Sequence, residues 1–162
     1  MLRITQATSH SDLDQARELF KEYEASLGIS LCFQNFADEL ANLPGDYAPP
    51  RGRLLLAREC DQLVGCIALR PVGPTTCEMK RLFVRPEYRD RGLGRVLVEA
   101  IIEEARKMGY TNLRLDTIAD RMDRAVALYK SIGFVEISPY RNNPVDSATF
   151  MELDLLTPKQ ST

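Results

Sequence analysis

Residues 78–95 read EMKRLFVRPEYRDRGLGR, and they join a strand to a helix through a glycine-containing turn. A strand is expected over Cys77–Val84, and Pro86 ends it. From Leu93 to Met108, apolar residues recur every three or four positions, which predicts an amphipathic helix that Gly109 closes. This succession of strand, turn and helix favours an α/β fold.

The turn in this segment has the features of an anion site. The first turn of a helix presents main-chain N–H groups without intrahelical partners, at the positive end of the helix dipole. Gly92 and Gly94 carry no Cβ atom, so the main chain can approach a ligand closely, and Arg89, Arg91 and Arg95 add positive charge. We expect a diphosphate here. The alternative interpretation is a tight turn with solvated arginines.

Two common nucleotide-binding motifs fit the sequence poorly. The P-loop pattern G-x-x-x-x-G-K-[ST] does not occur in it. A dinucleotide-binding fingerprint needs a third glycine and follows the first strand, whereas Gly92-Leu93-Gly94 lacks that glycine and follows the fourth predicted strand.

Hydrophobic periodicity predicts the other elements on both sides of this segment. Further strands are expected at Leu2–Gln6, Arg53–Glu59, Leu63–Pro71, Asn112–Ile118, Phe134–Ile137 and Ala148–Leu155. Further helices are expected from an N-cap at Ser11, with Asp14 three residues on, to Leu27, and at Phe33–Leu43 and Met122–Ile132; Pro44–Gly52 should be an exposed loop. The order predicts a mixed α/β sheet with helices on its faces, in one domain over residues 1–162.

Composition limits the classes of partner. The net charge is −2, whereas a general nucleic-acid binder shows a basic excess, so we expect no nucleic-acid partner. The sequence has no run of about 18 apolar residues and no signal-like start, so we expect a cytoplasmic protein without a membrane partner.

The metal-binding residue types are few and scattered. The irregular spacing of the four cysteines (Cys32, Cys60, Cys66 and Cys77) predicts buried free thiols rather than disulfides. The single histidine, His10, is expected to lie exposed in a loop before the first helix. We therefore expect no metal site.

Two motifs resemble those of a known family. R-x-x-G-x-G at residues 89–94 resembles the acyl-CoA pyrophosphate motif of the GNAT (Gcn5-related N-acetyltransferase) superfamily, and KRLFVRP at 80–86 resembles the strand before it. AVALYKSIGF at 125–134 resembles the later A-x-x-L-Y-x-x-x-G-F motif, and the element order matches over Leu2–Leu155. The resemblance implies a mostly antiparallel sheet of about seven strands, splayed between the fourth and fifth, with about four helices on its two faces.

The resemblance implies acetyl-CoA as co-substrate and direct transfer to a primary amine, without an acyl-enzyme. It implies that main-chain groups of Leu82 and Val84, on either side of Phe83, pair with the pantetheine arm, and that Tyr129 protonates the departing thiolate. It implies that the pyrophosphate is held by N–H groups of Arg89, Asp90, Arg91, Gly92, Leu93, Gly94 and Arg95. Met122 stands where the family often has asparagine, and Asp120 or Asp123 could take that place.

Glu78 is the first candidate for the base that takes the amine proton. It precedes Val84 by six residues, and this even spacing puts both on one face of the strand unless a bulge intervenes. The N–H of Val84 is then the candidate oxyanion donor. A simple ion pair of Glu78 with Lys80 is the alternative, and Asp116 on the next strand is a second candidate base. Cys66 and Cys77 are weak nucleophile candidates, because no histidine lies near them in the sequence.

The acceptor pocket is expected near the polar turn YRNNP at residues 140–144, where Arg141 could bind a substrate carboxylate, with Asn142 beside it. This favours a small acceptor such as an amino acid or an amine. A protein or peptide N-acetyltransferase and a non-catalytic acyl-CoA sensor remain alternatives, and the resemblance is compatible with a homodimer.

Overall fold

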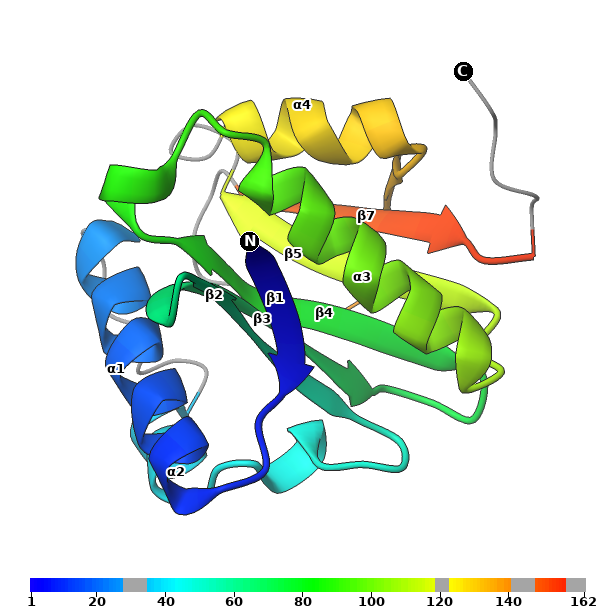
Figure 1. The fold of residues 1–162 in the computed structure, drawn as a ribbon. Coiled ribbons are helices and arrows are strands. Elements are labelled where there is room, and N and C mark those ends of the chain that lie inside the picture. The colour runs from blue at the N-terminus through cyan, green and yellow to red at the C-terminus, as the bar shows by residue number, and fades with distance from the viewer. Residues whose placement is uncertain (28–34, 119–122, 141–147, 157–162) are drawn as a thin grey trace.

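A seven-stranded sheet in the order β1-β2-β3-β4-β5-β7-β6 forms the middle layer of the computed structural model (Figure 1), which describes residues 1–27, 35–118, 123–140 and 148–156. The strands are β1 (Leu2–Gln6), β2 (Arg53–Glu59), β3 (Gln62–Pro71), β4 (Thr76–Val84), β5 (Asn112–Ile118), β6 (Val135–Ile137) and β7 (Ala148–Asp154). The helices are α1 (His10–Leu27), α2 (Phe36–Ala41), α3 (Leu93–Lys107) and α4 (Asp123–Ile132), with short 3-10 helices at Gly45–Tyr47 and Pro86–Tyr88.

The mixed sheet with helices on both faces confirms the expected fold class. All strand pairs are antiparallel except β4 with β5, which are parallel. That parallel ladder has only three residue pairs, of which Glu78 with Arg114 is the last. Because β4 continues to Val84, the two strands part beyond Glu78, as the resemblance implies.

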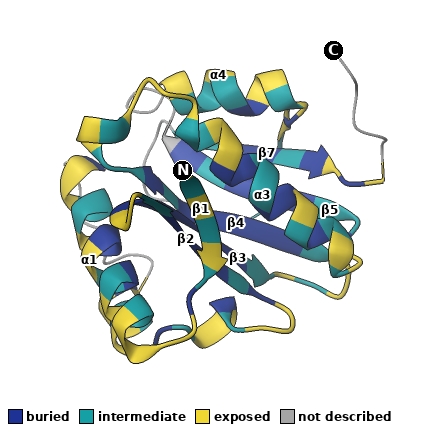
Figure 2. Ribbon diagram, in the orientation of Figure 1, coloured by how far each residue is buried: buried dark blue, intermediate teal, exposed yellow. Residues whose placement is uncertain are grey.

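Two hydrophobic cores lie on opposite faces of the sheet. One packs α3 and α4 against the sheet through residues such as Leu97, Ile101 and Tyr129. The other packs α1 and α2 through residues such as Phe20 and Phe36. β4 runs between them and is buried along most of its length, so Figure 2 draws it largely in dark blue. A functional group on β4 is therefore shielded from solvent unless the neighbouring elements leave a gap.

A β-bulge in β4 overturns the expected common face of Glu78 and Val84. The register with β3 shifts between Cys66 and Ala68, so two residues of β4 oppose one of β3, and Arg81 has a positive φ of 61°. An extra residue reverses the alternation of side chains. Glu78 consequently shares the α1/α2 face, whereas Val84 packs toward the α3 core.

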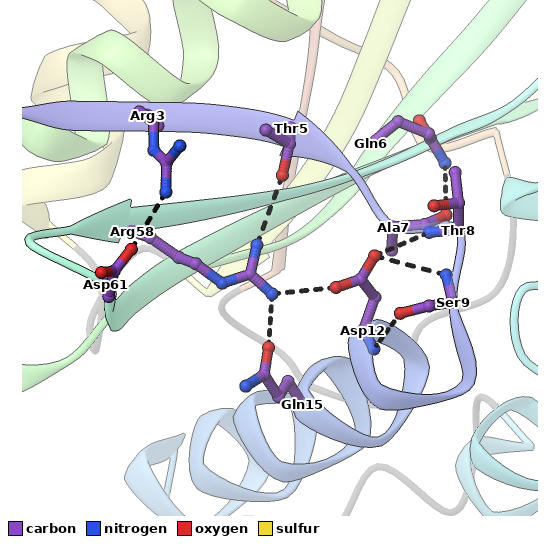
Figure 3. A network of polar contacts seen from close by, with 10 residues as sticks. All are labelled: Arg3, Thr5, Gln6, Ala7, Thr8, Ser9, Asp12, Gln15, Arg58 and Asp61. Atoms are coloured by element: carbon purple, nitrogen blue, oxygen red, sulfur yellow. Dashed lines mark hydrogen bonds and ion pairs between the residues drawn. The ribbon is translucent and has the colours of Figure 1, made fainter.

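The start of α1 differs from the predicted one. The helix begins at His10, so His10 is an exposed helical residue rather than a loop residue. Figure 3 shows why Ser11 is not the N-cap: the Ser9 hydroxyl accepts a hydrogen bond from the N–H of Asp12 at 3.0 Å. The Asp12 carboxylate in turn accepts from the N–H groups of Thr8 and Ser9. This reciprocal arrangement is the capping box that the sequence analysis placed two residues too late.

The capping box is also tied to the sheet. Arg58 of β2 donates to Asp12 at 3.0 Å and to the side chain of Gln15, so that one guanidinium joins α1 to β2 (Figure 3). The same guanidinium reaches Thr5 on β1 at 3.3 Å. The Asp12 and Arg58 side chains are only about one-fifth exposed, at 21% and 19%. The network therefore fixes where α1 leaves β1 and lies on the sheet.

Replacing Asp12 with asparagine should lower the free energy of unfolding by about 1–2 kcal/mol at neutral pH, because the charge of the capping carboxylate and its ion pair with Arg58 are lost. The Thr8 N–H hydrogen bond, helped by Ser9 and Arg58 and opposed by burial, lowers the pKa of Asp12 below its ordinary value. A carboxyl group whose pKa is lowered by folding stabilises the fold at pH values above its unfolded-state pKa. This stabilisation is lost as the pH falls through the folded-state pKa.

Urea melts at pH 7 and at successively lower pH would measure this effect, and the two proteins should converge in stability as the pH falls below about 4. Asp14→Asn is a matched control, since Asp14 is 74% exposed and only pairs with Arg17 one helical turn away. An equal loss in both variants would contradict the capping role.

Several predictions fall outside the described residues or need correction. Residues 28–34 are outside, and they include Cys32 and the first two residues of the predicted helix Phe33–Leu43; α2 begins at Phe36. The predicted loop Pro44–Gly52 contains the short helix Gly45–Tyr47. Cys66 and Cys77 are buried free thiols as predicted, but Cys60 is exposed because it lies in the turn between β2 and β3 with a φ of 50°.

Candidate functional site

A cleft of about 550 Å³ opens between the end of β4, the C-terminal end of α1 and the N-terminal ends of α3 and α4. Its volume lies in the range of small-molecule and cofactor sites. Nine of the ten residues predicted to bind the cofactor line it: Leu82, Phe83, Val84, Arg89, Asp90, Gly92, Leu93, Gly94 and Arg95. The other lining residues, which the sequence analysis did not assign to cofactor binding, are Tyr23, Ser26, Leu27, Tyr88, Arg124, Ala125 and Leu128.

The first turn of α3 forms one end of this cleft. Gly92 is the N-cap with a φ of 76°, a left-handed conformation that favours glycine. A Cβ atom at Gly92 would meet no atom within 4 Å, and one at Gly94 would meet only Leu128 Cδ2 at 3.7 Å. The protein's own packing therefore leaves the space in front of these glycines open, as a main-chain cradle for a diphosphate requires.

Positive charge surrounds the helix terminus. Arg89 donates to the carbonyl of Val84 at 2.9 Å and lies 5.6 Å from the ring centre of Phe83. Arg95 donates to the hydroxyl of Ser131 on α4. The carboxylate of Asp90, which would repel an anion, is paired with Arg124 at 2.8 Å. These contacts hold guanidinium groups around the cleft and offset the one acidic side chain in its lining.

Arg91 is the predicted cofactor-binding residue that does not line the cleft. Its guanidinium pairs with Glu59 on β2 at 3.3 Å and lies 5.4 Å from the ring centre of Tyr88. It therefore adds to the local positive charge from outside the cleft wall.

The apolar wall of the cleft is the part of β4 that β5 leaves unpaired. Leu82 and Val84 pack toward the α3 core, while Phe83 meets the ring of Tyr23 edge-on at 6.2 Å. A strand edge without a neighbouring strand offers N–H and C=O groups to an extended, amide-containing ligand. The pantetheine arm of coenzyme A has that chemistry, and the residues present therefore fit it.

Tyr129 follows the cleft-lining Leu128 on α4, is only 3% exposed and does not itself line the cleft. Burial, together with the nearby Tyr23, raises its pKa, so the phenol stays protonated at neutral pH. Its ring packs against Phe134 at 5.7 Å, yet no described residue hydrogen-bonds to its hydroxyl. A buried hydroxyl donor without a protein partner fits a bound group that accepts a proton.

Tyr23 of α1 lines the cleft and lies within the electrostatic reach of Asp116 on β5. Burial raises the pKa of Tyr23, Arg81 lowers it, and the negative charge of Asp116 on β5 raises it again. The sequence missed Tyr23 because it belongs to the apolar stripe of α1 and could be assigned to the core. Only the position of α1 against the end of β4 shows that its ring borders the cleft.

Glu78 lies on the α1/α2 face and is fully buried, at 0% exposure. Its Oε1 accepts from Arg70 on β3 at 3.0 Å, and Lys80 Nζ lies 4.0 Å from the same oxygen. Its Oε2 accepts from the hydroxyl of Tyr140. The predicted pairing with Lys80 is therefore present but is one part of a larger cluster, and Glu78 does not line the cleft.

The remaining predicted site residues divide into two groups. Arg141, Asn142, Met122 and Asp120 lie outside the described residues, as does the side chain of Asp123. Burial raises the pKa of Cys66 far above its usual range and that of Cys77 to about 12, which keeps both thiols in the unreactive protonated form. Among the described residues, no three His, Cys, Asp or Glu side chains gather as metal ligands would.

Comparisons with known proteins give a consistent result. A model of the Acetyltransferase (GNAT) family matches residues 13–134. An uncharacterized N-acetyltransferase of Schizosaccharomyces pombe is 47% identical over 146 residues, which are 89% of each chain. An IAA acetyltransferase of Azospirillum brasilense is 39% identical over 161 residues, covering 96% of this chain and 100% of that one.

Solved structures agree on the fold. The crystal structure of an acetyltransferase from Streptococcus agalactiae superimposes with a TM-score of 0.78 at 25% identity, over 94% of this chain and 98% of that one. In the described ranges, no helix combines the length and the apolar character needed to cross a membrane.

Proposed function

The chain belongs to the GNAT family of acetyltransferases, and from this premise we propose that it transfers an acetyl group from acetyl-CoA to a primary amine of a small molecule. The observation that carries the proposal is the cleft of about 550 Å³ with the glycine turn of α3 at one end and the unpaired edge of β4 along its wall. The first suits a diphosphate and the second suits an amide-containing arm.

The chemistry required of the protein follows from the reactants. An alkyl amine is mostly protonated at neutral pH, with a pKa of about 10.4 for a lysine-like group, so it must lose a proton before it attacks a thioester. Glu78 accepts that proton in our proposal, with Asp116 as the alternative. The N–H of Val84 stabilises the developing oxyanion, and Tyr129 donates a proton to the leaving thiolate.

The raised pKa of Tyr129 supports its role as a donor, because a phenol that stays protonated can give its proton to a thiolate. The protonated thiols of Cys66 and Cys77 support direct attack rather than an acyl-enzyme.

An acetyl-CoA assay with a panel of amines tests the function. Release of free thiol that depends on an amino acid, a polyamine or another small amine is the expected result. Release with peptides alone would replace the small-molecule acceptor by a protein acceptor. Tight binding of acetyl-CoA without release for any amine would leave a non-catalytic acyl-CoA sensor.

Replacing Gly94 with alanine tests the cofactor cleft. The new Cβ meets protein atoms no closer than 3.7 Å, so it projects into the cleft without a clash. We expect the Kd for acetyl-CoA to rise about tenfold, equivalent to about 1.4 kcal/mol of binding free energy. The free energy of unfolding should stay equal or increase by up to about 1 kcal/mol, because alanine replaces glycine in a helix.

Calorimetric titration and thermal melts would measure the two effects of Gly94→Ala separately. Gly73→Ala is the matched control, since a Cβ there meets only Thr76, at 3.9 Å, and Gly73 does not line the cleft. Unchanged affinity in Gly94→Ala would argue that the diphosphate binds elsewhere.

A further inference from the structure

Tyr140, which follows β6, contacts Glu78 directly and has no role yet in the proposed reaction. Its hydroxyl donates a hydrogen bond to Oε2 of Glu78. Its ring is held from two sides, because the Arg114 guanidinium lies 5.0 Å from the ring centre and the Phe150 ring meets it edge-on at 5.0 Å. β5 and β7 therefore fix the phenol against the carboxylate of β4.

The burial of Glu78 makes this contact important. At 0% exposure, the carboxylate does not border solvent or the cleft, and a base must reach its proton directly or through an intermediary. Arg70 and Lys80, which lie near Oε1, are cations that already carry all the protons they can hold. Tyr140 is neutral, half-buried and able to accept one proton while it gives up another.

We propose that Tyr140 relays the proton from the acceptor amine to Glu78; the proposal rests on the function proposed above. In this step an N–H bond of the ammonium group breaks and the proton binds Tyr140 Oη. The Tyr140 O–H bond breaks at the same time, and its proton binds Oε2 of Glu78. The amine becomes a neutral nucleophile, Glu78 becomes a neutral carboxylic acid, and Tyr140 ends as the phenol it was before.

The relay also requires the acceptor amine to bind beside Tyr140. The hydroxyl of Tyr140 reaches Glu78 on the α1/α2 face, at the last residue pair before β4 and β5 part. The gap between β4 and β5 leads from there along β4 to Leu82, Phe83 and Val84, which line the cleft. An amine on the α1/α2 face beside Tyr140 would then meet a thioester held in the gap.

The pH dependence of the relay is set by the charged groups around Glu78. On the strands these are Arg70 of β3, Lys80 of β4, Arg114 and Asp116 of β5, and Glu152 of β7, which pairs with Arg114 at 2.7 Å. On the elements that cover this face they are Tyr23 of α1, Glu39 of α2 and Tyr47. The Arg81 guanidinium of β4 also lies on this face, because it binds Glu39 and lies over the Tyr23 ring. Arg70 and Lys80 place positive charge beside Oε1 of Glu78, and the Tyr140 hydroxyl donates to Oε2.

Tyr140→Phe is the test, because it removes the hydroxyl and keeps the ring between Arg114 and Phe150. We expect kcat/KM for the amine to fall by at least about tenfold, within the range of lost general acid–base catalysis, with the Kd for acetyl-CoA unchanged. The acidic limb of the pH–rate profile should move to higher pH, because the carboxylate loses a donated hydrogen bond.

Tyr110→Phe is the matched control, since it also deletes a hydrogen-bonded hydroxyl. That hydroxyl lies outside the site and donates to the carbonyl of Arg51 over 2.7 Å. Its kcat/KM and acidic limb should stay as in the wild type. If Tyr140→Phe melts at a lower temperature than the wild type, Tyr140→3-fluorotyrosine is the second variant, because it keeps the hydroxyl and makes it more acidic. The acidic limb of its pH–rate profile should move if Tyr140 relays the proton and should stay in place if Tyr140 only packs.

An unchanged rate and an unmoved limb in Tyr140→Phe, with Glu78→Gln slow, would overturn the relay and leave the acetyltransferase proposal intact. A wild-type protein that releases no thiol with any amine would instead overturn the proposed function itself.

Discussion

Replacing Glu78 with glutamine should lower kcat/KM for the amine by about 10²–10⁴-fold, the usual contribution of a general base. Glutamine keeps the shape of the side chain, and its carbonyl oxygen can still accept from Arg70, but the amide cannot take up a proton. The Kd for acetyl-CoA should stay unchanged, because Glu78 does not line the cleft. Steady-state kinetics and calorimetric titration would measure the two quantities.

Glu104→Gln is the matched control for this prediction. Glu104 of α3 is a partly buried carboxylate, 27% exposed, that pairs with Arg53 of β2 and lines neither the cleft nor the surroundings of Glu78. It is not part of the proposed proton path, so its kcat/KM should remain within about threefold of the wild type, a difference below 1 kcal/mol. Glu78→Asp keeps the charge and should recover part of the rate. Full activity in Glu78→Gln would transfer the role of base to Asp116.

Replacing Glu39 with alanine should lower the free energy of unfolding by about 3–5 kcal/mol, the cost of leaving a buried ion without its partner. Arg81 donates two hydrogen bonds to Glu39, at 2.8 and 2.9 Å, and its side chain is only 2% exposed. The Phe36 ring, 5.0 Å away, completes the enclosure. In a protein of this size, the loss corresponds to about 6–20 °C in melting temperature.

Thermal and urea melts would measure this loss. Asp38→Ala is the control from the same helix, since Asp38 is exposed and should matter little. Glu39→Ala combined with Arg81→Met should restore much of the stability, because it removes the unpaired charge. A decrease of less than about 2 °C in Glu39→Ala would show that Arg81 finds water or another partner.

The sequence predicted the elements whose signals are local. The apolar stripe from Leu93 and the two glycines at its start specify α3 and its open first turn without reference to any other segment. Nine of the ten cofactor-binding predictions line the cleft for the same reason, since they lie close together in the chain and need only the strand, turn and helix to form.

What the sequence could not predict depends on contacts between distant segments. The bulge at Arg81 arises from its register with β3 and from its bond to Glu39 on α2, and neither leaves a periodic signal. Tyr140 was noticed only as part of a polar turn, because its partner Glu78 is 62 residues away. Ser9 was overlooked in favour of Ser11, since both precede an acidic residue by three positions and only the geometry of β1 decides between them.

The three-pair ladder between β4 and β5 has a mechanical consequence. It divides the sheet into two halves, β1 to β4 and β5 to β7, which are joined by these three pairs and by the chain segment that contains α3. A ligand with amide groups that binds between β4 and β5 beyond these three pairs would take the place of a strand and connect the two half-sheets by hydrogen bonds. The two half-sheets would therefore move least relative to each other when the ligand is bound, and they would regain that motion once the product leaves.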